Sequence, residues 1–544
     1  MRPVHLVLGL LLVSGPVVNA QRPGGGGPGG GLPRGAAIVP APAYVRTTPP
    51  ADPVIQQLWE EGTQRSQAMR LAQELADVVG PRLTASPAAT VASDWAMAKY
   101  KAWGVTARRE NYGTWNSWRR GVSHLDLIAP RVRSLEALQL AWSPGTNGKP
   151  IEGDVAGIPE LADSNAANAW LKGIRGKFVL IGEPQLSCRM PAQWSEYGTA
   201  ESQRRIARSR DSVTASWRAR LATFNGELRA KLATAGALGA LASNWSNYPG
   251  IDKIFGSWRQ AVPTVDVGCE DYGLLSRLAA NGQGPRVRYS AESQFLGEQP
   301  VFNTIAEIRG SEKPDEYVLL SAHFDSWDGA SGATDNGTGT VTMMEALRIL
   351  RAVYPNPKRT ILVGHWQGEE QGLNGSRAYS EDHPEVVRGL QALFNQDNGT
   401  GRVVALSPGA LPGAVPRLAG YLTMLPGQAT SILALGQPGP PATGGTDHAS
   451  FACHGAPAFG FFSYGWDYFS TTWHTNRDTF DKLVAEDLVH NATLTAMLAY
   501  AASEDPDPMP RDRLDPLPID SRTGQPMVWE PCPKATRKTV DSAR

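Results

Sequence analysis

The chain of 544 residues lacks the motifs of several common enzyme classes. It contains no His-Glu-x-x-His of a single-zinc protease and no Gly-x-Ser-x-Gly nucleophile elbow. No glycine-rich phosphate loop stands between an expected strand and an expected helix. Lysine plus arginine and aspartate plus glutamate number 52 each, so the formal net charge is zero. Because nucleic-acid binding relies on neutralising phosphates with basic side chains, we expect no nucleic-acid partner.

Cysteine is scarce, with 4 residues in the whole chain. A small, even number fits an exported protein and allows several alternative disulfide pairings. Because Cys188 and Cys269 lie within one candidate domain, we rank a bond between them first among the possible pairings. Free, buried thiols are an alternative of equal weight. The remaining two cysteines are Cys453 and Cys532.

No segment after the first 20 residues is apolar enough to be a transmembrane helix. Residues 1–20 combine Arg2, an apolar run and small residues ending at Ala20, a pattern typical of a secretory signal. That run is too short to anchor a chain in a bilayer, so we expect no stable membrane insertion. We therefore expect cleavage after Ala20 and a secreted or periplasmic protein.

Side chains that can bind a metal recur through the C-terminal half, mostly at the ends of apolar runs. They supply imidazoles and carboxylates as ligands, with one carboxylate left over that can act as a base. Zinc takes imidazole nitrogen and carboxylate oxygen, and two zinc ions about 3.5–4 Å apart need a carboxylate between them. The inventory therefore predicts a hydrolase site with two zinc ions. Its members are His323, Asp335, Glu369, Glu370, Asp397 and His474.

Residues 300–505 alternate expected strands with expected helices. Apolar runs at 317–322, 359–366 and 390–395 predict strands, and a helical period at 340–350 predicts a helix. Such alternation indicates an α/β sheet with helices on both faces. Ligands gather beyond the carboxyl ends of the strands in these sheets, and most of the metal-binding side chains fall there.

Five motifs stand in one fixed order in this region. They are Ser-Ala-His323-Phe-Asp325-Ser-Trp-Asp, Ala-Thr-Asp335-Asn-Gly, Gly-Glu369-Glu370-Gln-Gly, Asn-Gln-Asp397 and His474-Thr-Asn-Arg-Asp478-Thr. Each alone is compatible with an ordinary turn or strand end, but together they resemble peptidase family M28, the cocatalytic zinc exopeptidases. Within the family, the likeness is greatest to secreted carboxypeptidase Q-like members. It implies an α/β fold with a mixed, mostly parallel sheet sandwiched by helices.

The resemblance implies a cofactor of two zinc ions per chain and a role for each ligand. His323 and Asp397 would hold one ion, and Glu370 and His474 the other. Asp335 would bridge the two ions, and the family places a cis peptide bond directly after this residue.

The resemblance also implies the groups that act beside the metals. Glu369 would be the catalytic residue, the general base that activates a metal-bridged water and returns its proton to the leaving amine. Asp325 would orient the His323 imidazole, a common arrangement around zinc.

The residue before the last histidine departs from the family pattern. Many relatives carry a tyrosine there, whose hydroxyl steadies the oxyanion, whereas this chain has Trp473, which can only donate a hydrogen bond. Trp473 itself, Tyr464, Tyr468 or the metals could fill the oxyanion role. His448 stands where relatives line the substrate pocket, so we weigh substrate contact equally against packing.

The chain divides into segments of different composition. Residues 131–295 resemble a β-rich protease-associated domain inserted into a peptidase domain, although an arginine-rich stretch at 204–229 interrupts the pattern. The expected segments are a signal peptide at 1–20, a flexible Gly/Pro-rich leader at 21–50, the first peptidase part at 51–130, the insertion at 131–295, the main peptidase part with the metal site at 296–505 and a tail at 506–544.

The combined observations predict an exported zinc exopeptidase that hydrolyses dipeptides or short peptides. The resemblance implies that an aspartate rather than a glutamate at the Asp397 position favours enzymes acting at the amino end, so we favour an aminopeptidase or dipeptidase, with carboxypeptidase action as the alternative. Arg377 and Arg477 lie near the motifs and could bind a terminal carboxylate. A non-catalytic binding protein on a peptidase scaffold is the alternative from another class. The chain could also form a homodimer.

Overall fold

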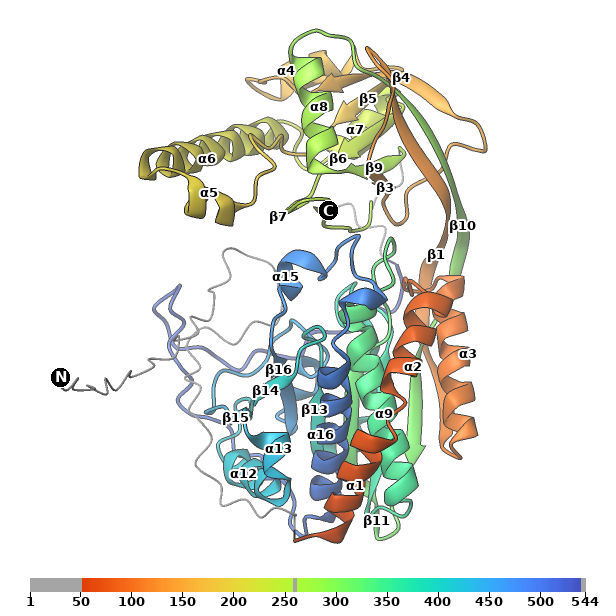
Figure 1. Cartoon of the computed structure of the whole chain (residues 1–544), viewed down its shortest axis with the longest axis vertical. Helices are drawn as coiled ribbons and strands as arrows, with labels where there is room; N and C mark the ends of the chain where they lie inside the picture. The colour runs from red at the N-terminus through yellow and green to blue at the C-terminus, as the bar shows by residue number, and fades with distance from the viewer. Residues whose placement is uncertain (1–50, 258–261, 540–544) are drawn as a thin grey trace, which may run out of the picture.

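The computed structural model describes residues 51–257 and 262–539 of the chain. The expected signal peptide at 1–20 and leader at 21–50 lie outside the described residues. Two lobes are joined along one edge by a long two-stranded ribbon (Figure 1). The lower lobe contains the predicted metal-binding residues, and the upper lobe contains most of the inserted region.

The ribbon consists of two antiparallel strands that continue from one lobe into the other (Figure 1). Its pairing breaks at several irregular positions, where bulges let such long strands bend and twist. The predicted boundary between residues 295 and 296 falls within the second strand, because both lobes share it. The strands are β1 (Thr106–Ala129) and β10 (Arg286–Ile308).

The lower lobe is built on the predicted α/β sheet. Strands β11, β12, β13 and β16 run parallel, while β10 and β14 pair antiparallel at the two sides of this group. The mixed, mostly parallel sheet therefore confirms the predicted fold class. The bounds are β11 (Lys313–His323), β12 (Arg359–Trp366), β13 (Leu390–Asn395), β14 (Val403–Leu406), β15 (Ala434–Leu435) and β16 (Ala458–Ser463).

Helices cover both faces of this sheet. On one face α1, α9 and α16 contact one another, and the other face carries α10, α11 and α14. Asp52 caps α1 by accepting from the Val54 and Ile55 N–H groups, and a proline follows at the first helical position. The bounds are α1 (Pro53–Gln64), α9 (Thr338–Val353), α16 (Ala485–Glu504), α10 (Asn374–Asp382), α11 (Pro384–Gly389) and α14 (Ala449–Ala452).

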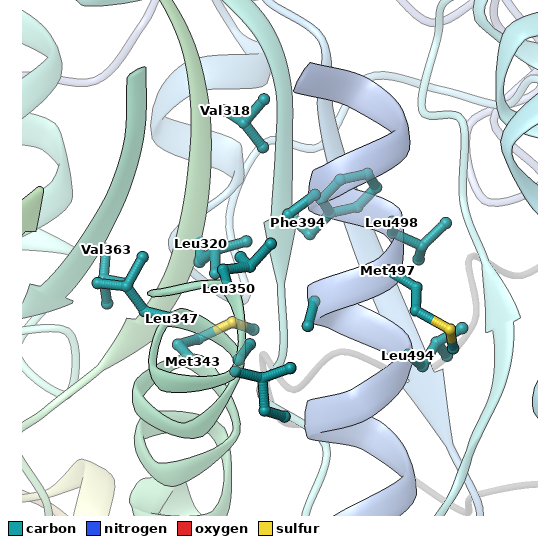
Figure 2. Packing of buried hydrophobic residues seen from close by; sticks show 14 of the residues in the cluster. Val318, Leu320, Met343, Leu347, Leu350, Val363, Phe394, Leu494, Met497 and Leu498 are labelled. Atoms are coloured by element: carbon teal, nitrogen blue, oxygen red, sulfur yellow. The ribbon is translucent and has the colours of Figure 1, made fainter. Parts of the chain in front are cut away.

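The largest hydrophobic core lies between the sheet and α9 and α16 (Figure 2). Its aliphatic side chains are fully buried, and each contributes roughly 1.5–3 kcal/mol through removal from water. This packing fixes the strands whose carboxyl ends carry the site. Figure 2 labels Val318, Leu320, Met343, Leu347, Leu350, Val363, Phe394, Leu494, Met497 and Leu498.

The upper lobe contains helices as well as strands, so the expected β-rich description of the insertion needs correction. Four parallel strands form its centre, with one hydrophobic cluster on each face. Trp217 is the buried residue of the arginine-rich α6, which agrees with a solvated charged helix. The bounds are β4 (Ile151–Gly157), β5 (Lys177–Leu180), β6 (Gly239–Ala242), β9 (Thr264–Val267), α4 (Ser164–Leu171), α6 (Ala200–Ala222), α7 (Leu228–Ala235) and α8 (Cys269–Ala280).

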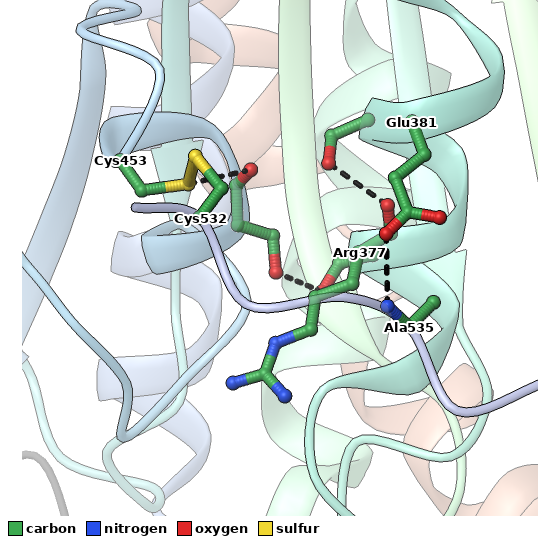
Figure 3. Close-up of a disulfide and its surroundings, with 8 residues drawn as sticks. Arg377, Glu381, Cys453, Cys532 and Ala535 are labelled. Carbon is green, nitrogen blue, oxygen red and sulfur yellow. Dashed lines mark hydrogen bonds between the residues drawn. A yellow bond between two sulfur atoms is a disulfide. The ribbon is translucent and has the colours of Figure 1, made fainter. Parts of the chain in front are cut away.

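Both disulfides that the sequence allowed are present. Cys188 bonds to Cys269 within the upper lobe, as our first choice predicted, and Cys453 bonds to Cys532. The second bond ties the C-terminal tail to the lower lobe, where the tail runs past α10 and the Ala535 N–H donates to Glu381 (Figure 3). No helix within the described ranges is both long and apolar enough to span a bilayer.

Candidate metal centre

The predicted residues of the main sheet meet at one edge, beyond the carboxyl ends of three parallel strands. His323 is the last residue of β11, and Glu369 and Glu370 follow β12 in a tight turn. Asp397 lies two residues past the end of β13. Neighbouring parallel strands end at the same edge, so residues far apart in sequence come together there.

Two clusters of nitrogen and oxygen atoms share one carboxylate. The His323 Nε2 atom lies 3.3 Å from Asp335 Oδ1 and 3.4 Å from Asp397 Oδ1. The His474 Nε2 atom lies 2.9 Å from Glu370 Oε2 and 3.3 Å from Asp335 Oδ2. Asp335 therefore turns one oxygen toward each imidazole, and the five predicted ligands form two groups of three that share it.

The chemistry of these groups fits zinc. Each group combines one imidazole with two carboxylates, the donor types that zinc prefers. Glu370 Oε1 is buried without a hydrogen-bond partner. A buried carboxylate oxygen without a partner is costly, and a bound cation would satisfy it.

Charge and burial shift the pKa values of the cluster in opposite directions. Burial lowers the pKa of His474 to about 4, so its imidazole is neutral at pH 7 and available as a ligand. Burial acts the same way on His323, but the carboxylates of Asp397 and Glu369 outweigh it and raise its pKa well above the usual value. The group formed by His323, Asp335 and Asp397 therefore favours a positive charge at its centre.

Glu369 lies beside the clusters as a half-buried acid. Burial raises the pKa of its carboxyl well above the usual range; the His323 imidazole opposes this, and Asp397 and Asp447 raise it further. A raised pKa brings a carboxyl closer to neutral pH, where it can both accept and return a proton.

Asp325 contacts both the His323 imidazole and the turn that carries the two glutamates. The His323 Nδ1 atom lies closer to the Asp325 backbone carbonyl, at 3.0 Å, than to its carboxylate, at 3.7 Å. The Asp325 carboxylate accepts the backbone N–H groups of Glu369 and Glu370 at 3.2 and 3.3 Å, and the Thr84 hydroxyl at 2.9 Å. It therefore fixes the turn that carries both glutamates.

The turn that carries Asp335 is held by a second buried acid. The Asp478 carboxylate accepts the N–H groups of Thr334 and Asp335 at 2.7 and 3.0 Å. The bond between Asp335 and Asn336 is cis, as the family likeness implied. Arg82, fully buried, donates to the carbonyls of Phe324, Gly332 and neighbouring loop residues.

His474 lies on a loop rather than on the sheet, and a segment of the upper lobe supports it. The Ile254 N–H donates to the His474 carbonyl at 2.7 Å, and Lys253 forms a β-bridge with Thr475. The Phe255 ring meets the His474 ring edge-on, with centres 5.2 Å apart. We call residues 252–255 the support segment.

The support segment also holds the residues just before His474. The Lys253 ammonium donates to the carbonyls of Phe469 and Trp473, and it lies 4.5 Å from the centre of the Trp473 ring. His474 has a left-handed backbone, with φ of 51°, which a residue other than glycine rarely adopts. The contacts from the segment offset the cost of that conformation.

The residues considered for substrate or oxyanion contact occupy different environments. The Trp473 ring stacks on the His474 imidazole with centres 3.9 Å apart. His448 is half-buried, and loss of contact with water lowers its pKa to about 4. Tyr464 is 51% exposed, whereas the Tyr468 hydroxyl approaches the Asp335 carboxylate from a buried position.

Sequence reasoning did not assign roles to Lys253, Phe255, Asp478 and Arg82. Asp478 lay within a quoted motif, so its position was a usable signal. The other three come from segments without metal-binding residues, and their roles depend on contacts between distant parts of the chain.

Comparisons with known proteins agree with the geometry. Residues 303–499 match the model of peptidase family M28. The chain is 25% identical to carboxypeptidase Q from Homo sapiens and from Pongo abelii, over 80% of this chain and 85% of each relative.

Solved structures share the fold. A peptidase M28 precursor from Shewanella amazonensis superposes with a TM-score of 0.62 at 24% identity, covering 86% of this chain and 99% of that one. A zinc aminopeptidase from Bacillus subtilis gives a TM-score of 0.52 at 18% identity, covering 81% and 95%. Residues 303–499 thus match peptidase family M28, as the motifs predicted, and the comparisons support a zinc-dependent hydrolase.

Proposed function

We propose that the chain is an exported exopeptidase that uses two zinc ions to hydrolyse dipeptides or short peptides. His323 and Asp397 would hold one ion, and Glu370 and His474 the other. The observation that carries this proposal is Asp335, whose two oxygens lie 3.3 Å from the Nε2 atoms of two different histidines. A carboxylate shared in this way is what a pair of zinc ions requires.

The chain's own residues divide the work of peptide hydrolysis. When bound, the zinc ions would polarise the scissile carbonyl and acidify a water molecule. Glu369 accepts a proton from the attacking water and delivers it to the leaving amine, a role that its raised pKa supports. Asp325 holds the backbone of Glu369 in place through the N–H contact at 3.2 Å.

Apolar and aromatic side chains border the Glu370–His474 half of the site. A pocket there is lined by Ile254 and Trp327 together with Asp335, Glu370 and His474. The apolar wall limits water near the reacting groups, which strengthens the electrostatic interactions inside. Tyr468, close to Asp335, is a better candidate for oxyanion contact than the exposed Tyr464.

Export is part of the proposal. The described cysteines are all paired in disulfides, which persist in oxidising compartments. The predicted cleavage after Ala20 supports a secreted or periplasmic location.

A panel of dipeptides tests the proposal, with each member free, N-acetylated or C-amidated. We expect chelator-sensitive cleavage of at least one member, and a loss of about 10²–10⁴-fold in kcat for Glu369→Gln. Glu201→Gln, on the exposed start of α6, is the matched control and should keep full activity. Protein that holds two zinc ions and cleaves nothing would refute the proposal and favour a binding protein on a peptidase scaffold.

A further inference from the structure

The guanidinium of Arg377 lies beside the turn that begins at Glu369. The N–H groups of Gly372 and Leu373 both donate to the Glu369 carbonyl at 2.8 Å, and α10 begins directly afterwards. Arg377 is in the first turn of that helix. Its Nη1 atom lies 4.0 Å from the point where a Cβ on Gly372 would stand, so the side chain folds back along the Glu369 turn.

This guanidinium has no hydrogen-bonding or ion-pair partner among the described residues. Figure 3 shows it extending away from Glu381 and Ala535, with no interaction drawn to it. Arg377 is only partly exposed, and burial lowers its pKa while the carboxylates of Asp447 and Glu369 raise it. A guanidinium offers five donors, and those of Arg377 are open to an anion that enters from solvent.

Other cations around the centre are already engaged. Arg477 donates to the Gly250 carbonyl and pairs with Glu136, and Lys253 donates to two backbone carbonyls. Arg82 is surrounded by carbonyl oxygens, and Arg537 pairs with acids of α10. Of these five cations, Arg377 alone is available to an incoming anion.

The chemistry of peptide hydrolysis says which anion would bind there. A guanidinium matches a carboxylate through two parallel N–H···O bonds. In a dipeptide, or at the C-terminal residue of any peptide, a single carbon separates the leaving nitrogen from the terminal carboxylate. The group that binds this carboxylate must therefore lie close to the group that protonates the nitrogen. Arg377 and Glu369 meet that requirement.

We propose that Arg377 binds the C-terminal carboxylate of the substrate and so restricts cleavage to dipeptides and C-terminal residues. The inference rests on the proposed exopeptidase function. It assigns the carboxyl end of the peptide to the α10 side of the site, and Arg377 becomes a residue that determines specificity.

Binding to zinc-loaded full-length Glu369→Gln protein tests this without turnover. Alanyl-alanine and its C-terminal amide are titrated calorimetrically. We expect the free acid to bind roughly tenfold or more tightly than the amide, because hydrogen bonds to a charged group are lost in the amide. Adding Arg377→Gln should remove the preference, Arg377→Lys should keep part of it, and the exposed Arg388→Gln should leave it unchanged. Equal affinities for acid and amide, or a preference that survives Arg377→Gln, would overturn the assignment.

Turnover by otherwise unchanged protein separates this inference from the proposed function. Cleavage that ignores C-amidation and survives Arg377→Gln would leave the exopeptidase function intact and reject Arg377 as the anchor. Absent turnover, combined with an Arg377-dependent preference for the free acid, would reject the peptidase function and retain the carboxylate site.

Discussion

The two halves of the proposed metal centre have the same ligand chemistry but different supports: the strand-end half is His323 with Asp397, and the loop half is His474 with Glu370. His323 and Asp397 follow neighbouring parallel strands of the main sheet, and His323 is 1% exposed. His474 lies on a loop with a left-handed backbone, and residues from the upper lobe hold it. The strand-end half is fixed by the core, whereas the loop half depends on contacts with the inserted region. The insertion therefore supports the loop that carries His474 in the proposed metal centre.

Asp335→Asn should have the largest effect, because Asp335 serves both halves. Loss of the shared carboxylate removes an oxygen donor from each cluster, so we expect less than full zinc occupancy at both positions and no measurable turnover. His474→Ala should instead leave the strand-end half able to bind one ion. Metal analysis after dialysis at fixed free zinc distinguishes the two variants, with Asp211→Asn as an exposed control. Full occupancy in Asp335→Asn would contradict the shared role.

Lys253→Met should weaken the loop half selectively. The variant removes the ammonium that binds the carbonyls of Phe469 and Trp473, and supporting residues of this kind typically change metal affinity by about 10–100-fold. We expect the more weakly bound zinc to be lost while the other keeps its affinity, as measured by competition with a chromogenic chelator. Lys149→Met, an exposed change in the same lobe, should change neither. Equal weakening of both ions would mean that the halves are not supported separately.

Raising the pH should destabilise the support segment and strand β9, which carry two acids with raised pKa values. Burial raises the pKa of Asp252 to about 8 and that of Asp266 to about 7, from ordinary values of 3.8. The folded protein thus retains protons that the unfolded chain releases. This stability is present at pH values below 3.8 and is lost as the pH rises through 7 and 8.

Asp266→Asn tests this pH dependence. The neutral amide keeps one oxygen that can accept the shorter Asn244 hydrogen bond, at 2.7 Å, and it cannot lose a proton, so the variant should lose less thermal stability than the parent between pH 5 and pH 8. The expected difference is a few kcal/mol at most. Unfolding midpoints of chelator-treated protein at several pH values measure it. An unchanged slope in the variant would show that Asp266 is ionised in the folded protein at both pH values.

The sequence predicted the strand-end half better than the loop half. Apolar runs gave β11, β12 and β13, and their ends placed His323, Glu369 and Asp397 on one edge through the geometry of parallel strands. The inventory of metal-binding side chains included His474, and the likeness to a known family added its pairing with Glu370 and the cis bond after Asp335. Both kinds of signal are local in sequence.

The support of His474 left no comparable signal. Ile254 and His474 are 220 residues apart, and their hydrogen bond joins backbone atoms, which carry no residue-specific pattern. The sequence likewise could not show that the Arg377 guanidinium lacks an ion-pair partner in the described part of the chain, because that depends on which acidic side chains the fold places beside it. Asp325 was identified as a supporting residue, but its main partners, the N–H groups of the glutamate turn, depend on how β11 and β12 align.

Trp473→Phe should have the smallest effect, and it tests what replaced the family's tyrosine. The indole stacks on the His474 ring at 3.9 Å and receives the Lys253 ammonium on its face. A phenyl ring retains both contacts but cannot donate a hydrogen bond. If Trp473 serves as an aromatic wall, kcat should stay within a small factor of the parent, while Trp473→Ala should weaken zinc binding at the loop half as Lys253→Met does. A large fall in kcat for Trp473→Phe, with zinc affinity unchanged, would instead assign the indole N–H to the oxyanion. That result would mean that the loop half, which depends on contacts with the insertion, takes part in catalysis as well as in zinc binding.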